Sequence, residues 1–139
     1  MATIEKFEDI ISWKEARTLN KVIGDLIDGG RFKNSYRLIN QIEGAAGSIM
    51  DNIAEGFERG GNKEFIQFLY IAKASCGELR SQLYRALDRN YIDQKEFDQI
   101  STHAKKISSL IQKFITYLEN TDTKGVKYKK RTGVENKSS

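Results

Sequence analysis

Two long segments in the second half of the chain repeat apolar residues at alternating intervals of three and four positions. One apolar seam covers residues 65–86 and the other covers residues 97–118. Each is a sustained heptad pattern, which is typical of helices that pack with a left-handed twist. Because residues 90–93 form a short connection, we expect antiparallel neighbouring helices near 62–89 and 94–119.

Two further helices are expected in the first half of the chain. Apolar residues at helical spacing, followed by the glycine pair 29–30, predict a helix near 13–28. A second stripe, followed by the glycine pair 60–61, predicts a helix near 35–59. In its middle, residues 44–48 are only Gly, Ala and Ser. This composition indicates either close packing by another backbone or a break in the helix.

Polar residues mark where three of these helices are expected to start. Ser12 with Glu15, and Asp93 with Glu96, form capping boxes, in which each pair satisfies two free N–H groups at a helix N-terminus. Asn62 is expected to cap the helix that follows the second glycine pair. The chain has no proline, and no alternating strand pattern competes with these helices.

The predicted fold is therefore all-α. We expect an antiparallel up-and-down four-helix bundle over residues 1–119, followed by a basic, disordered tail over residues 120–139. The net charge of +4 is confined to this tail, which contains six basic and two acidic side chains. Because the bundle itself is neutral, a nucleic-acid-binding role requires local clusters of basic residues.

Cysteine content and hydropathy indicate the cellular compartment of the protein. The one cysteine, Cys76, excludes an intramolecular disulfide and fits a reducing compartment. No apolar run approaches the ~18 residues of a membrane span, and the N-terminus lacks the layout of a signal peptide. We expect a cytoplasmic protein that has no membrane partner.

Few residues favour catalysis. His103, the one histidine, is expected on the polar surface of the last helix, and Cys76 falls on an apolar seam with no histidine placed to activate it. Glu55, Glu64 and Glu78 are candidate metal ligands, but the chain lacks the Glu-x-x-His pairs that di-metal bundles use. We predict no catalytic residue, no metal ligand and no cofactor.

Basic residues occur in local sets that either contact phosphates or belong to an ordinary solvated surface. In two of these sets, the basic residues are seven positions apart and share one face of a helix. A third set flanks the second glycine turn, and the fourth is concentrated in the tail. The candidate nucleic-acid contacts are Arg59, Lys63, Lys73, Arg80, Lys106, Lys113, Lys127, Lys129, Lys130 and Arg131. Such contacts act through counterion release, and the tail alone confers no sequence specificity.

Asn52 and Glu55 lie near one helical turn apart beside the apolar stripe of the second helix. We interpret them as a buried structural polar network that links the second helix to the third, with Arg59 or Lys63 supplying charge. This interpretation is favoured over catalysis, because the surrounding segment is rich in small residues.

The third predicted helix has more apolar residues than one bundle seam needs. Ile66, Phe68, Tyr70 and Ile71 lie outside the seam. These side chains either thicken the core or face another subunit, since large exposed apolar patches are uncommon on monomers. We expect an oligomer.

Residues 48–56, Ser-Ile-Met-Asp-Asn-Ile-Ala-Glu-Gly, are followed by Arg59 and by the segment 63–72. This stretch resembles the signature of the 23S ribosomal RNA intervening-sequence proteins, and the resemblance covers about residues 7–119. It implies a small bacterial four-helix bundle that forms a homo-oligomer, with a pentameric ring favoured. The accessory proteins of diversity-generating retroelements are similar, and they bind nucleic acid and a reverse transcriptase.

One departure from the family bears on function. Members often carry two arginines where this chain has Glu43 and Gly44, which removes positive charge from the second helix. Two function hypotheses remain. The first is a non-enzymatic oligomer associated with RNA or DNA, above all with structured ribosomal RNA. The alternative is an oligomeric scaffold that holds a protein partner without binding nucleic acid directly.

Overall fold

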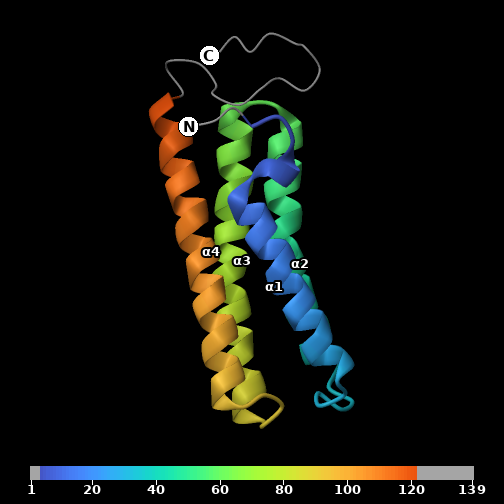
Figure 1. The fold of residues 1–139 in the computed structure, drawn as a ribbon. Coiled ribbons are helices and arrows are strands. Elements are labelled where there is room, and N and C mark those ends of the chain that lie inside the picture. The colour runs from blue at the N-terminus through green and yellow to red at the C-terminus, as the bar shows by residue number, and fades with distance from the viewer. Residues whose placement is uncertain (1–3, 122–139) are drawn as a thin grey trace.

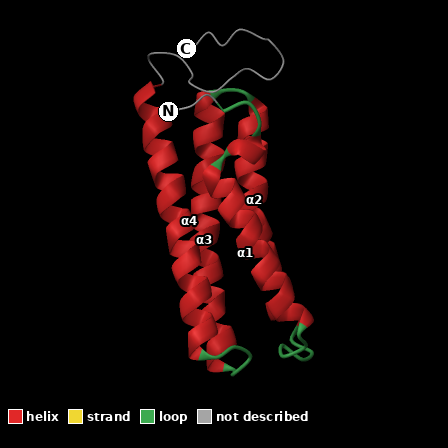
Figure 2. Cartoon of the chain, viewed as in Figure 1, coloured by secondary structure: helices red, strands yellow, loops and turns green. Residues whose placement is uncertain are grey.

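The four helices follow one another with short connections in the computed structural model, which describes residues 4–121. A short 3-10 turn, η1 (Phe7–Asp9), precedes the helices α1 (Ile11–Asp28), α2 (Tyr36–Arg59), α3 (Asn62–Asp88) and α4 (Gln94–Thr121) (Figure 1). All regular structure in this range is helical (Figure 2). The prediction of an all-α up-and-down bundle is confirmed. The expected tail lies outside the described residues, apart from its first two positions, which continue α4.

Sequential helices are the neighbours in this bundle. The α2–α3 and α3–α4 contacts are the most extensive, and α1 packs more closely on α2 than on α4. The turn between α2 and α3 and the last residue of α4 lie at the same end of the bundle as η1 (Figure 1). With 27 and 28 residues, α3 and α4 are each about 40 Å long and set the length of the bundle.

The heptad seams form the core. Phe65, Leu69 and Leu83 of α3 are completely buried, as is Ile107 of α4. Phe65 packs edge-on against Phe114, with ring centroids 5.3 Å apart. Burying each such side chain contributes about 1.5–3 kcal/mol, so the seams account for the main stabilising force between α3 and α4.

The helices α2 and α3 approach each other closely at Gly56. A Cβ atom added there would lie 2.7 Å from Cβ of Phe68 and 2.9 Å from Cδ1 of Phe65. The small-residue segment 44–48 lies elsewhere on an unbroken helix, and a Cβ atom at Gly44 would meet no atom within 4 Å. The alternative of a helix break is therefore wrong, and the segment does pack closely on its neighbours, because Ala45 and Ala46 are buried and the side chain of Asn20 on α1 donates to the carbonyl oxygen of Ala46 at 2.8 Å.

The capping box at Ser12 is wrong, whereas the one at Asp93 is confirmed. In α1 the N-cap residue is Ile10, and Ser12 lies inside the helix with its hydroxyl buried and without a hydrogen-bond partner. At the start of α4, the N–H of Glu96 donates to Oδ1 of Asp93 at 2.8 Å, and the N–H of Asp93 donates to Oε1 of Glu96 at 2.9 Å.

Asn62 is the first residue of α3 rather than its cap, because Gly61 occupies the cap position. Its side-chain amide donates to the carbonyl oxygen of Leu118 at 3.2 Å, which ties the start of α3 to the end of α4. A tertiary hydrogen bond has replaced the local one that the sequence predicts.

Candidate functional site

A groove between α3 and α4 brings together basic residues from both helices. We call it the α3–α4 groove, and it has a volume of about 580 Å³. Three cations line it, together with one tyrosine and several small residues: Lys73, Arg80, Lys105, Tyr70, Ala74, Cys76, Gly77, Ser108 and Ser109. None of these lining residues is acidic, so the groove has a local charge of +3 on a bundle that is neutral overall.

Lys73 and Arg80 share one flank of α3 because they are separated by seven residues, which is almost two full turns. The amino group of Lys73 donates to Oε1 of Gln112 at 2.6 Å, and this neutral acceptor leaves the ammonium charge uncompensated. Nε of Arg80 is buried without a hydrogen-bond partner. Within residues 4–121, no carboxylate forms an ion pair with Lys73, Arg80 or Lys105.

Cys76 lies at the base of this groove as a buried thiol. Burial raises its pKa to about 12, although the nearby charge of Arg80 acts in the opposite direction. The thiol is therefore protonated at neutral pH, and it is a packing residue rather than a nucleophile.

Lys106 and Lys113 face α1, on the other side of α4. Nζ of Lys106 lies 3.5 Å from Oε2 of Glu15, and Lys113 lines a hollow beside the start of α1. The structure therefore brings Lys73 and Arg80 together but separates them from these two lysines. Lys105, which is not among the predicted contacts, faces the groove instead.

Arg59 and Lys63 lie at the turn between α2 and α3, away from the groove. The guanidinium of Arg59 pairs with Glu55 at 2.9 Å and lies over the ring of Phe68, 5.1 Å from its centroid. Lys63 is exposed on the first turn of α3. The remaining predicted contacts, Lys127, Lys129, Lys130 and Arg131, lie outside the described residues.

Asn52 joins α2 to α3 through a serine pair. Its side-chain amide donates to the carbonyl oxygen of Ser48 at 2.8 Å and to the Ser48 hydroxyl at 2.9 Å, and that hydroxyl lies 2.8 Å from Oγ of Ser75. Glu55 takes no part in this network. It is exposed and pairs with Arg59 on its own helix, so the predicted partnership of Asn52 with Glu55 is wrong.

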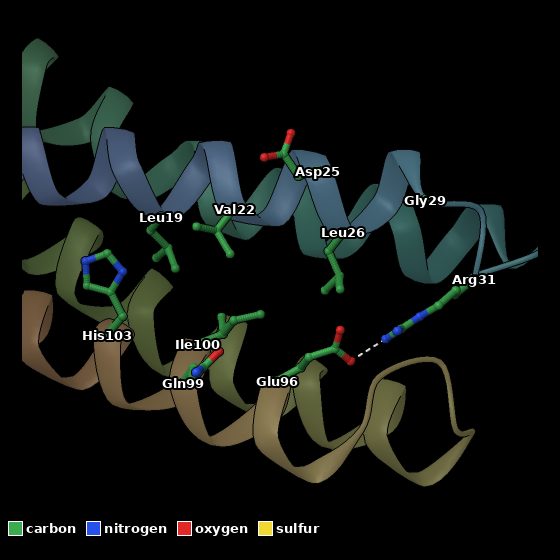
Figure 3. A pocket seen from close by; sticks show the side chains of 10 residues that line it. All are labelled: Leu19, Val22, Asp25, Leu26, Gly29, Arg31, Glu96, Gln99, Ile100 and His103. Atoms are coloured by element: carbon green, nitrogen blue, oxygen red, sulfur yellow. Dashed lines mark hydrogen bonds and ion pairs between the residues drawn. The ribbon is translucent and has the colours of Figure 1, made fainter.

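A second groove separates α1 from α4 (Figure 3). We call it the α1–α4 groove, and its volume is about 590 Å³. Leu19, Val22 and Leu26 of α1 point toward Ile100 of α4, which gives the groove an apolar floor (Figure 3). The floor of this groove is therefore apolar, whereas the α3–α4 groove is basic.

Polar contacts bridge both ends of the α1–α4 groove. At one end Arg31 reaches across to the Glu96 carboxylate, and this hydrogen bond is the main cause of the lowered pKa of Glu96 (Figure 3). At the other end Nε2 of His103 lies 2.7 Å from Oε1 of Glu15, and the hydrogen bond from His103, helped by Lys106, lowers the pKa of Glu15.

His103 was expected on the open surface, but it is half-buried in this bridge, with 21% of its side chain exposed. Among residues 4–121, no three His, Cys, Asp or Glu side chains are grouped so that they could hold a metal ion, and Glu55, Glu64 and Glu78 do not converge. No helix in the same range is long and apolar enough to cross a membrane.

Comparison with known proteins identifies the family. Residues 8–113 match the family model described as 23S rRNA-intervening sequence protein. The fold is similar to a crystal structure of a protein with unknown function from the S23 ribosomal protein family of Bacteroides thetaiotaomicron. The TM-score is 0.68 at 21% identity, and the match covers 76% of this chain and 98% of that one. No curated protein sequence matches significantly. The heptad seams, the four-helix bundle and the matched residues agree, and the chain belongs to the 23S rRNA-intervening sequence protein family.

Proposed function

We propose that the protein is a non-enzymatic, oligomeric bundle that associates with nucleic acid through the α3–α4 groove. The observation that supports this proposal is the gathering of Lys73, Arg80 and Lys105 in one groove without a carboxylate partner. Structured ribosomal RNA is the first ligand to test, because the family is described by its 23S rRNA intervening sequences. No cofactor takes part, and we place the protein in the cytoplasm.

Three cations per subunit make a modest electrostatic contact. Each phosphate that is neutralised contributes about 0.7–0.9 to the slope of log affinity against log salt, so one groove gives a slope of roughly −2 to −3. Assembly of several subunits would multiply this contact on one RNA, since linked sites bind with a high effective concentration. The oligomer is therefore part of the proposed mechanism.

We propose that self-association uses the outer face of α1 that carries Ile11 and Val22. Ile11 and Val22 are eleven residues apart and so share one face of that helix, with 63% and 41% of each residue exposed. Val22 also lines the α1–α4 groove, whose apolar floor continues this face. A second copy of the chain would cover a surface that water otherwise contacts, and five copies remain the favoured number.

The nucleic-acid proposal is tested by charge reversal in the groove. Labelled 23S rRNA fragments are titrated with the full chain at about 50 and about 200 mM salt, and binding is followed by fluorescence anisotropy. The double variant Lys73→Glu/Arg80→Glu should weaken binding at least tenfold and flatten the salt dependence. The matched control is Lys33→Glu/Arg37→Glu, which reverses two exposed cations near the start of α2 and should leave binding unchanged.

Deleting residues 122–139 separates the groove from the basic tail. Binding that survives this deletion and disappears in the groove variant supports the proposal. Binding that depends on the tail alone contradicts it and favours the alternative function. That alternative is an oligomeric scaffold for a protein partner, which the apolar floor of the α1–α4 groove supports.

A further inference from the structure

Two of the three cations of the α3–α4 groove, Lys73 and Arg80, are partly buried between the helices, whereas Lys105 is exposed. Nε of Arg80 is buried, and Lys73 is half-buried against Gln112. Packed helices are about 8–10 Å apart, so the groove between two of them is narrow. A duplex carries its phosphates on a broad convex surface, whereas one strand is thin enough to enter.

The lining of the groove leaves room for a strand to come close. Ala74, Gly77, Ser108 and Ser109 have short side chains, and a Cβ atom added at Gly77 would meet no atom within 4 Å. The volume of about 580 Å³ is typical of a site for a small ligand. It fits a few units of a phosphodiester chain rather than the side of a double helix.

Tyr70 adds an aromatic surface to the same groove. It lies almost one turn before Lys73 on α3, and 45% of the residue is exposed. Its hydroxyl lies 3.5 Å from the Glu119 carboxylate, and the residue lines the groove. Proteins that hold single strands combine basic grooves with such aromatic rings, because bases stack on the rings while cations follow the backbone.

We propose that the α3–α4 groove binds a single strand of nucleic acid, such as an RNA loop, and does not bind a duplex. Lys73, Arg80 and Lys105 contact phosphates of this strand, and a base stacks on Tyr70. This inference rests on the proposed function, because it specifies which form of nucleic acid enters the groove.

The test compares a single strand of about 12 nucleotides with a duplex that contains the same strand. The full chain is titrated against each labelled ligand at about 50 mM salt. We expect tighter binding of the single strand. Tyr70→Ala should weaken that binding about 5- to 150-fold, which is the range for loss of one stacked base. Tyr70→Phe keeps the ring and should retain the affinity.

Tyr36→Ala is the matched control, since Tyr36 is an exposed tyrosine on α2 outside the groove, with 65% of the residue exposed. It should leave single-strand binding unchanged, and circular dichroism should show that each variant is folded. Equal affinity for strand and duplex, with no effect of Tyr70→Ala, overturns this inference. In that case binding that is still lost in Lys73→Glu/Arg80→Glu leaves the proposed function standing. Failure of the unaltered chain to bind either ligand overturns both.

Discussion

At the scale of single residues, Gly56 and Asn52 determine how α2 lies against α3. Gly56 allows contact with Phe65 and Phe68, while Asn52 holds Ser48 beside Ser75. Gly56 belongs to the apolar stripe that the sequence reveals, but stripe positions give no measure of interhelical distance. The role of Ser75 also depends on how far α3 is rotated about its axis. The sequence therefore identifies Gly56 and Asn52 as notable positions, but it does not identify the residues of α3 that they contact.

Substituting Gly56 tests this close approach. In Gly56→Ala the new methyl group overlaps Cβ of Phe68, so α2 and α3 must move apart. We expect the free energy of unfolding to fall by about 1–3 kcal/mol, as in other overpacked cores. Urea unfolding followed by circular dichroism measures this change.

Gly44→Ala is the matched control on the same helix. Its methyl group enters open space, and alanine is the better helix former, so this variant should gain about 0.5–1 kcal/mol. Equal responses of the two variants would contradict the close approach at Gly56.

At the scale of elements, periodicity predicts the helices well and predicts their ends and neighbours less well. The heptad seams define α3 and α4 because every seventh residue returns to the same face. Ser12 fails as a cap because burial of that position competes with the local hydrogen bond, whereas the exposed pair Asp93 and Glu96 meets no such competition. Likewise the side chains of Lys105 and Lys106 point 100° apart about the axis of α4. Which of them faces the α3–α4 groove therefore depends on where α3 and α1 pack against α4.

Acid should loosen the contact between α1 and α4. The pKa of Glu15 is lowered from 4.5 by His103, so the folded protein binds this proton less readily than the unfolded chain does. The resulting stability is present above about pH 4.5 and is lost as the pH falls through the lower folded value. Urea unfolding at pH 7 and at about pH 3 should therefore show a smaller acid-dependent loss in Glu15→Gln than in the unaltered chain.

The control for this pH series is Glu43→Gln, which removes an exposed carboxylate on α2. It should reproduce the pH dependence of the unaltered chain. An identical acid-dependent loss in Glu15→Gln would show that the bridge to His103 does not contribute.

At the scale of the whole molecule, α4 separates two surfaces of different character. The α3–α4 groove is basic, and the α1–α4 groove has an apolar floor. Net charge conceals this division, because residues 1–119 sum to zero. The sequence indicated local basic sets, and its excess of apolar residues lay on the third helix rather than at the α1–α4 groove. It did not predict two different surfaces on opposite sides of α4, since that arrangement depends on tertiary packing.

The mass in solution tests the apolar surface of α1. Light scattering during size-exclusion chromatography should give about 80 kDa for five chains of 15.9 kDa. Ile11→Arg/Val22→Arg should lower this mass, because buried unpaired charges oppose association. The control is Tyr36→Arg, which alters an exposed tyrosine on α2 and should keep the assembly intact. A mass of about 16 kDa for the unaltered chain at micromolar concentration contradicts self-association.

Cys76 makes the chain ready for selective chemical labelling. It is the one cysteine, and with a pKa of about 12 its buried thiol stays unreactive toward maleimides at neutral pH. A cysteine introduced at an exposed position is therefore the sole target, with no native thiol to remove. Fluorophores on a cysteine at Ser109 in one preparation and at Lys106 in another would report separately on the two sides of α4. Nearby positions of one helix thus serve as independent optical sensors of strand binding and of assembly.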